Sequence, residues 1–290
     1  QDPSLGNEEV GAIFVGHKND QRGIERTRRL FTTLNRHAKP VSKKDSIALD
    51  EDDVVAIVTR RLADEYPLFH EKLSLAESKN LPVADNKNFT SIIALYDSLD
   101  IYLRAKPRGW NDIKKRRPPE SEINKYYAKS VEFWDRLVGQ FEWLQKYYEK
   151  ESANGIATEF RNEDGGYLLF RPIGVLLIVK VIKSIILTGK PLDEAIQLIS
   201  KIPVFLTDDP WNGLLWDPLN RRMITAPVNQ FVGEKLAFYS VGGDLELRYK
   251  SNPENLKKQL AGVLNKQVDE INLPLYYSSV SYTHLRAHKT

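Results

Sequence analysis

The sequence has no cysteine, and methionine occurs only once, at Met223. Without thiols the chain can form neither disulfides nor thiolate metal sites, and it has no cysteine nucleophile. Long hydrophobic runs are also missing, because Lys180 and Lys183 interrupt the most apolar stretch, residues 173–187. A membrane-spanning helix needs about 20 consecutive apolar residues. We therefore expect a cytoplasmic protein that does not contact a membrane.

Common enzyme motifs are absent as well. The sequence contains no G-x-x-x-x-G-K-[ST] phosphate loop, no G-x-G-x-x-G after a strand, no H-E-x-x-H and no G-x-S-x-G. Asp244 and Glu246 precede Leu and Arg, where a nuclease motif would have lysine. These absences favour a protein that is not an enzyme, and we assign no catalytic residue, no metal and no cofactor.

Both ends of the chain are unusual. Residue 1 is Gln and the single Met lies far inside, so we expect an internal fragment that lacks its original N-terminus. Residues 279–290 (SVSYTHLRAHKT) resemble a translated sequencing adaptor. We therefore expect this tail not to be native, and we exclude it from functional inference.

Charge is unevenly distributed along the chain. The net charge is only +3, yet residues 18–44 hold nine basic residues against Asp20 and Glu25, a local net of +7. Residues 104–117 (RAKPRGWNDIKKRR), here called the basic loop, hold seven basic residues against Asp112, a net of +6. The rest of the chain therefore carries −10. Such segregation predicts two anion-binding patches on an acidic body.

The first patch has helical periodicity over residues 22–36. At 100° per residue, Arg22, Arg26, Arg29 and Arg36 fall within a sector of about 80°, opposite Ile24, Phe31 and Leu34. Arginine favours bidentate phosphate contacts, so this face predicts polyanion binding, although a solvated helix face is the alternative. The predicted contacts are Arg22, Arg26, Arg29, Arg36, Lys39, Lys43 and Lys44.

The basic loop is rich in Pro and Gly, which predicts an irregular conformation. Lys114, Lys115, Arg116 and Arg117 are the second set of predicted phosphate contacts, with Trp110 as a stacking or packing residue. A solvated loop is the alternative. The acidic run 50–53 could suggest a metal site, but its position at a helix start favours capping.

Periodicity and breakers predict an α+β protein that is predominantly α. We expect a strand at 10–15, then helices at 22–36, 51–62 (capped by Asp50), 89–103, 121–148, from 172 onward and at 192–200. The predicted domains are a partial α/β core at 1–66, a linker at 67–88 and an α-helical domain at 89–278. Aromatic residues spaced 4 and 3 apart along 121–148 predict a packing seam.

Residues 11–62 (GAIFVGHKNDQRGIERTRRLFTTLNRHAKPVSKKDSIALDEDDVVAIVTRRL) resemble the region after the namesake motif of DGQHR-domain proteins, the group that includes the DNA sulfur modification regulator DndB. The similarity rests on an LF-x-x-LN pattern at Leu30, Phe31, Leu34 and Asn35, and on the AKP turn at 38–40. FRPIG at 170–174 and PWNGLLW at 210–216 are also similar, so the resemblance spans about residues 5–243. The DGQHR motif itself is not in the chain and would belong upstream.

The resemblance implies a ParB- and sulfiredoxin-like α/β core, of which only the second part is present, followed by a helical domain. It also implies DNA binding that controls phosphorothioation genes. Our leading hypothesis is a bacterial DNA-binding regulatory or accessory protein of a DNA-modification or phage-defence system, with double-stranded DNA as its partner. One alternative is a ParB-like nucleotide-binding switch or NTPase, with a nucleoside triphosphate held by the same arginines. Another is a non-catalytic interaction component of a defence complex that exposes the aromatic seam. A second copy of the chain is a further candidate partner.

Overall fold

The computed structural model describes residues 20, 23, 41–82, 84–104 and 109–277. The chain divides into two compact units, Gln1–Val41 and Ser42–Thr290. The strand expected at 10–15, nearly all of the helix expected at 22–36 and most of the α/β core expected at 1–66 lie outside the described residues, which include only residues 41–66 and two single residues of that core. All that follows concerns the second unit.

Two capped helices open this unit. In α2 (Lys43–Leu49), the Ser42 side chain accepts a hydrogen bond from Asp45 N, and in α3 (Val54–Glu65), Asp53 Oδ1 accepts from Val55 N at 2.8 Å. The expectation that Asp50 caps this helix is wrong. Asp50 Oδ1 instead accepts from Asp52 N at 2.8 Å and holds the turn before α3, which leaves Asp53 as the cap. The buried face that periodicity predicted, Val54, Val58 and Leu62, is confirmed.

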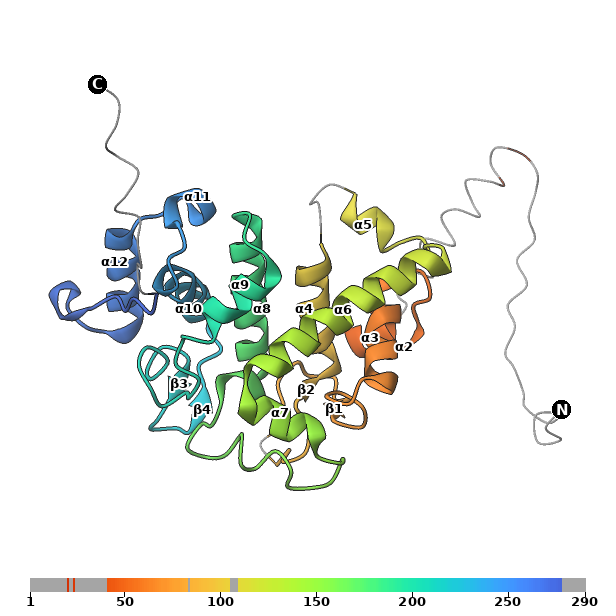
Figure 1. Ribbon diagram of the computed structural model, residues 1–290, viewed down its shortest axis with the longest axis horizontal. Coiled ribbons are helices and arrows are strands. Elements are labelled where there is room, and N and C mark those ends of the chain that lie inside the picture. Colours follow the sequence, from red (N-terminus) through yellow and green to blue (C-terminus); the bar gives the residue numbers. More distant parts are fainter. Residues whose placement is uncertain (1–19, 21–22, 24–40, 83, 105–108, 278–290) are drawn as a thin grey trace. The chain divides into compact units, whose positions relative to one another are not determined.

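The centre of the unit is a pair of apolar helices, α4 (Ile92–Leu103) and α8 (Pro172–Leu187), which pack against each other (Figure 1). Both bury residues around most of their circumference, which is typical of helices enclosed by a core. A short parallel pair, β1 (Leu73–Ser74) and β2 (Thr90–Ser91), leads into α4, with Leu73 opposite Thr90. Ser91 then caps α4 by accepting from Ala94 N at 3.2 Å.

The helix expected at 121–148 is two helices, α6 (Glu120–Gln140) and α7 (Glu142–Glu149), with α5 (Trp110–Ile113) before them. The chain breaks at Phe141, whose backbone is extended at φ −120° and ψ 111°. This bend directs the Phe141 ring into the core, where it lies 5.1 Å from the Trp143 ring. The single-helix expectation is wrong because a hydrophobic spacing does not show whether a helix continues through an aromatic residue.

Aromatic packing joins α6 and α7 to residues that precede α4. Trp134 on α6 is fully buried and makes edge-to-face contacts with Phe69 at 5.0 Å and with Phe89 at 6.3 Å. A buried ion pair between Arg161 Nη2 and Asp85 Oδ1, at 2.9 Å, ties the same region to the turns that follow α7. The described part of the predicted linker 67–88 therefore contacts the common core near both of its ends, through Phe69 and Asp85. The predicted domain boundaries remain predictions.

The remainder is mostly helical. It contains η2 (Leu168–Phe170), α9 (Leu192–Ile199), the antiparallel pair β3 (Trp216–Asp217) and β4 (Arg222–Met223), α10 (Pro227–Ser240), α11 (Leu245–Tyr249), α12 (Pro253–Leu264) and η3 (Val268–Glu270). The predicted starts of α8 and α9 are confirmed. The fold is predominantly α with small sheets, as the sequence predicted. Over the described residues, no helix is long and apolar enough to cross a membrane.

Gly174 in the FRPIG segment provides a test of this packing. A Cβ at Gly174 would lie 1.9 Å from the Leu168 carbonyl oxygen, whereas a Cβ at Gly139, on α6, would meet nothing within 4 Å. We expect Gly174→Ala to lower the free energy of unfolding by about 1–3 kcal/mol through overpacking. Gly139→Ala is the matched control and should raise it by at most about 1 kcal/mol through helix propensity. Urea denaturation measures both, and an unchanged midpoint for Gly174→Ala would contradict the close approach.

Candidate nucleic-acid interface

The structure describes only some of the predicted phosphate contacts. Those of the first patch that precede Val41 lie outside the described residues: Arg22, Arg26, Arg29, Arg36 and Lys39. The described ones are Lys43 and Lys44, at the start of α2, and Lys114, Lys115, Arg116 and Arg117, which follow α5. These basic residues look alike in the sequence, but they differ in exposure and in ion pairing.

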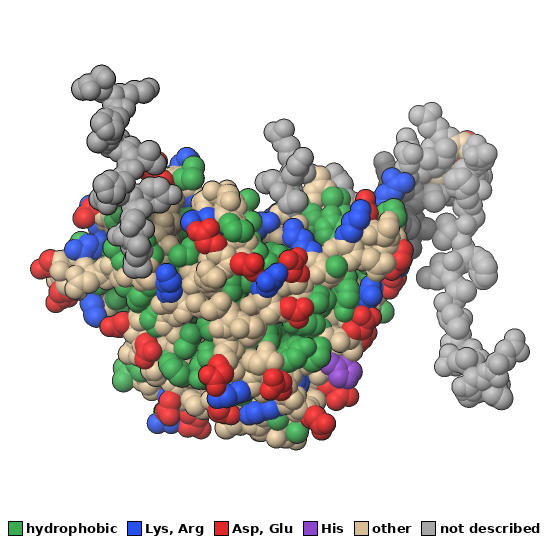
Figure 2. Space-filling view, viewed as in Figure 1, with side chains coloured by type: hydrophobic (Ala, Val, Ile, Leu, Met, Phe, Trp, Pro, Cys, Tyr) green, Lys and Arg blue, Asp and Glu red, His purple; other side chains and the backbone are tan. Residues whose placement is uncertain are grey.

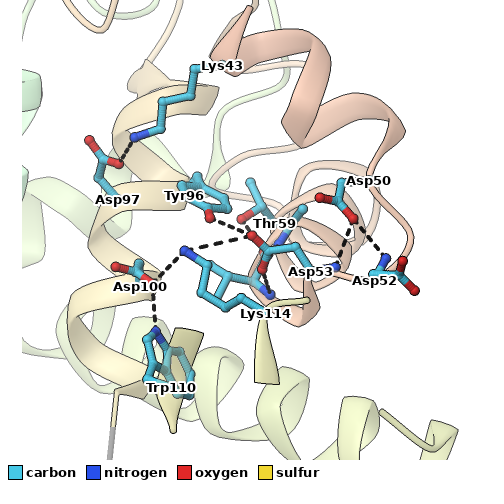
Figure 3. A network of polar contacts seen from close by, with 12 residues as sticks. Lys43, Asp50, Asp52, Asp53, Thr59, Tyr96, Asp97, Asp100, Trp110 and Lys114 are labelled. Atoms are coloured by element: carbon cyan, nitrogen blue, oxygen red, sulfur yellow. Dashed lines mark hydrogen bonds and ion pairs between the residues drawn. The ribbon is translucent and has the colours of Figure 1, made fainter. Parts of the chain in front are cut away.

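Lys114 is held inside a network of carboxylates and aromatic rings (Figure 3). Its ammonium lies 3.0 Å from Asp100 Oδ1, 3.8 Å from Asp53 Oδ2 and 4.9 Å from the centre of the Tyr96 ring. The side chain is only 20% exposed. A cation enclosed in this way stabilises the fold and has little capacity left for an external phosphate.

Asp100 on α4 is the centre of that network. Its Oδ1 also accepts from Trp110 Nε1 at 2.8 Å (Figure 3). Its Oδ2 pairs with Arg104 at 2.5 Å. Trp110 is buried, which excludes the stacking role and supports the packing role that the sequence left open. Burial raises the pKa of Asp100, but the hydrogen bonds from Trp110 and Lys114 outweigh it, so the net pKa lies below its usual value.

Asp53 and Tyr96 connect the network to α3. The Tyr96 hydroxyl donates to Asp53 Oδ2 at 2.6 Å, while Asp53 Oδ1 caps α3. Burial, and then the hydrogen bond to Asp53, raises the pKa of Tyr96, so this hydroxyl stays protonated and remains a donor. Capping as the role of the acidic run 50–53 is thus confirmed for Asp53.

Arg117 and Lys43 are partly exposed but paired. Arg117 Nη1 lies 2.6 Å from Glu51 Oε2, and its backbone N donates to Asp52 Oδ1 at 3.3 Å. Lys43 pairs with Asp97 on α4, and its ammonium lies 5.2 Å from the Tyr96 ring centre. These contacts fasten α2 to α4 and fasten the end of the basic loop to the turn before α3.

Lys115 and Arg116 differ from these neighbours. Both side chains are exposed, and neither pairs with any carboxylate in the described part of the chain. Lys44, which is half-buried, is likewise without an ion pair there. Acidic and basic side chains are interspersed over the face seen in Figure 2, with no extended area of one sign. Free positive charge on the described basic loop is therefore concentrated at Lys115 and Arg116.

Sequence reasoning missed Asp97 and Asp100. The signal was present, because the 92–103 segment (IIALYDSLDIYL) is otherwise nearly apolar and carries these two carboxylates three residues apart, on one face. Acidic residues on one face of an otherwise apolar helix need positively charged partners. They therefore indicate that basic residues from other parts of the chain pack against that face. Among the described residues, no group of three or more His, Asp or Glu side chains is arranged to hold a metal ion.

The aromatic seam belongs to the interior. Trp134 is 0% exposed and Phe141 is 7% exposed. The seam is therefore not an exposed surface, and the observation that motivated the protein-interaction hypothesis no longer supports it.

The structure thus defines a predominantly helical α+β protein in which the basic loop is anchored by Asp100 and Glu51 and, in its described part, presents two cations without an ion pair. A family model described as DndB, DNA-sulfur modification-associated, matches residues 1–213. The chain belongs to this family, which confirms the resemblance found in the sequence and associates the protein with DNA-sulfur modification. Comparison with curated proteins and with solved structures gives no match.

The lowered pKa of Asp100 gives a pH-dependent prediction. An aspartate with a depressed folded-state pKa stabilises the fold above its unfolded pKa, and this stabilisation is lost as pH falls through the folded value. We expect Asp100→Asn to lower the free energy of unfolding at pH 7 by about 1–3 kcal/mol, because it weakens charge-assisted bonds to Lys114 and Arg104. The difference from wild type should shrink below about pH 4, where Asp begins to protonate.

Urea denaturation at pH 7, 5 and 3 measures this difference. Asp193→Asn is the control, because Asp193 forms an exposed pair with Arg136 at 3.4 Å and should have little effect at any pH. A loss for Asp100→Asn that is the same at all three pH values would show that the side chain acts by shape and not by charge.

Proposed function

We propose that this protein is a DNA-binding regulatory or accessory component of a DNA-sulfur modification system, and that Lys115 and Arg116 contact the phosphates of double-stranded DNA. The observation that carries the proposal is their exposure without a carboxylate partner in the described structure. Family membership supplies the DNA context. The role is non-catalytic, in keeping with a sequence that has none of the enzyme motifs considered above.

The anchoring of the basic loop supports this assignment physically. Lys114 and Arg117 flank the two free cations and are bound to Asp100 and Glu51, so the intervening backbone is held at both ends. Binding a phosphate then costs less conformational entropy than binding by a loose segment. Contacts of this kind go to the DNA backbone, so they provide affinity and position without reading the base sequence.

The arginine stripe that the sequence predicts belongs to the same proposal. Arg22, Arg26, Arg29 and Arg36 precede the described unit, and Lys39 follows them in the sequence. Basic residues in two segments of one chain can neutralise several phosphates together, which makes the affinity strongly dependent on salt. A ParB-like nucleotide switch would use the same arginines and is distinguished by the ligand that they bind.

Fluorescence anisotropy with a labelled DNA duplex, over a series of salt concentrations, tests the proposal. The slope of log K against log salt is negative, and each phosphate contact adds about 0.9 to its magnitude. We expect Lys115→Gln with Arg116→Gln to weaken binding and to reduce the magnitude of this slope by about 2, because two contacts are lost. The magnitude should also decrease for Arg26→Glu with Arg29→Glu.

Lys257→Gln with Lys258→Gln is the matched control. It removes two adjacent positive charges from α12, which lies outside both predicted patches. The proposal fails for the basic loop if Lys115→Gln with Arg116→Gln and the control Lys257→Gln with Lys258→Gln change the slope equally. It fails as a whole if the full chain does not bind duplex at low salt, and calorimetric binding of a nucleoside triphosphate in that case would favour the nucleotide switch.

A further inference from the structure

A cavity of about 210 Å³ lies between α4, α8 and α10, on a side of α4 that Asp97 and Asp100 border. Its apolar lining comes from Ile101, Ile173, Leu176 and Leu177. Charged side chains from the same helices, and Lys79 from the loop before β2, complete it. The cavity therefore combines an apolar floor with a polar and charged rim, which also includes Gln230 on α10.

Two lysines on this rim have unused hydrogen-bonding capacity. Lys79 pairs with Asp97 at 2.5 Å and Lys180 on α8 pairs with Glu234 on α10 at 3.2 Å, while their side chains remain 43% and 42% exposed. An ammonium group has three N–H donors, so each lysine can donate further bonds without giving up its carboxylate.

The carboxylates of the rim are, in contrast, already well supplied with donors. Asp97 accepts from Lys43 as well as from Lys79, and Glu234 accepts from the Tyr249 hydroxyl at 2.8 Å in addition to pairing with Lys180. Asp100 is held by the three donors of the network described above. The three carboxylates that line the cavity are thus paired with five cations: Lys43, Lys79, Arg104, Lys114 and Lys180.

Only Lys79 and Lys180 of these cations line the cavity, and their free N–H donors, rather than an excess of charge, favour an anionic ligand. We propose that the cavity binds a small organic anion, with a phosphate or carboxylate group between Lys79 and Lys180 and a short hydrocarbon part on the floor formed by Leu176 and Leu177. The volume is below the range of about 300–1,000 Å³ that is typical of drug-sized ligands, so the hydrocarbon part is only a few carbons long. The site is separate from Lys115 and Arg116, and it gives the protein a small-molecule ligand besides DNA.

Isothermal titration calorimetry of the full chain with four probes tests the inference. Butyl phosphate and hexanoate represent the two head groups, inorganic phosphate lacks the hydrocarbon part, and butylammonium carries the opposite charge. We expect saturable binding of butyl phosphate or hexanoate, weaker binding of inorganic phosphate and none of butylammonium. Whichever organic anion binds more tightly identifies the head group.

Lys180→Gln should weaken binding of the organic anion about tenfold or more, because it removes a charge-assisted bond. Lys190→Gln is the matched control, since Lys190 is 43% exposed and paired with Glu194 outside the cavity. Leu176→Trp should abolish binding by filling the cavity while DNA binding remains. Because Lys180 is half-exposed, Lys180→Gln tests the site even if Leu176→Trp fails to fold.

Three results would overturn the inference. The first is the absence of saturable binding of either organic anion to protein that circular dichroism shows to be folded. The second is an equal effect of Lys180→Gln and Lys190→Gln. The third is binding of inorganic phosphate or butylammonium as tightly as of the organic anions, because the apolar floor or the sign of charge would then contribute nothing.

Discussion

The enclosure of α4 is the constraint on which the rest of the described unit depends. This helix packs against α3, α6 and α8, so nearly all of its surface faces apolar neighbours. The exception is the stripe that carries Asp97 and Asp100, whose side chains are each only 16% exposed. Carboxylates beside an apolar interior need opposite charges and hydrogen-bond donors to remain ionised. The chain supplies them from α2, from the loop before β2 and from the basic loop.

This requirement explains why the basic loop is less available to a partner than its charge count indicates. Two of its described cations, Arg104 and Lys114, serve Asp100, and Arg117 serves Glu51. The carboxylates therefore convert part of a basic segment into structural contacts, and they leave Lys115 and Arg116 held between two fixed points. A local excess of Lys and Arg gives the formal charge of a segment. The folded structure determines how many of those side chains remain without an ion pair.

The same stripe of α4 also borders the cavity. Asp97 and Asp100 hold cations on one side and line the cavity together with Leu176 and Lys180 of α8 on the other. The charged rim and the apolar floor have one cause. The faces on which α4 and α8 contact each other carry apolar side chains, and their charged side chains lie only where the helices face solvent.

Local sequence signals were sufficient to predict the helical class, the positions of α4, α8 and α9, and the family. These features depend on local signals: apolar periodicity, Pro172 at a helix start and segments such as FRPIG. The sequence did not predict the break at Phe141, because an aromatic residue at a seam position is compatible with a continuous helix and with a bend into the core. Asp53 replaced Asp50 as the cap of α3 for a similar reason, since either carboxylate can cap a nearby turn.

Which of the described basic residues lack an ion pair depends on contacts between distant parts of the fold. In the sequence, Lys114 to Arg117 are four adjacent cations with no local feature that distinguishes them. Their partners are distant in the chain, because Lys114 bonds to Asp100 across 14 residues and Arg117 to Glu51 across 66. Ion pairing depends on distance in space and on the surrounding dielectric, and neither quantity is encoded in a local pattern. The packing of α4 brought Asp100 within reach of Lys114, and the turn before α3 placed Glu51 beside Arg117, while Lys115 and Arg116 remained exposed.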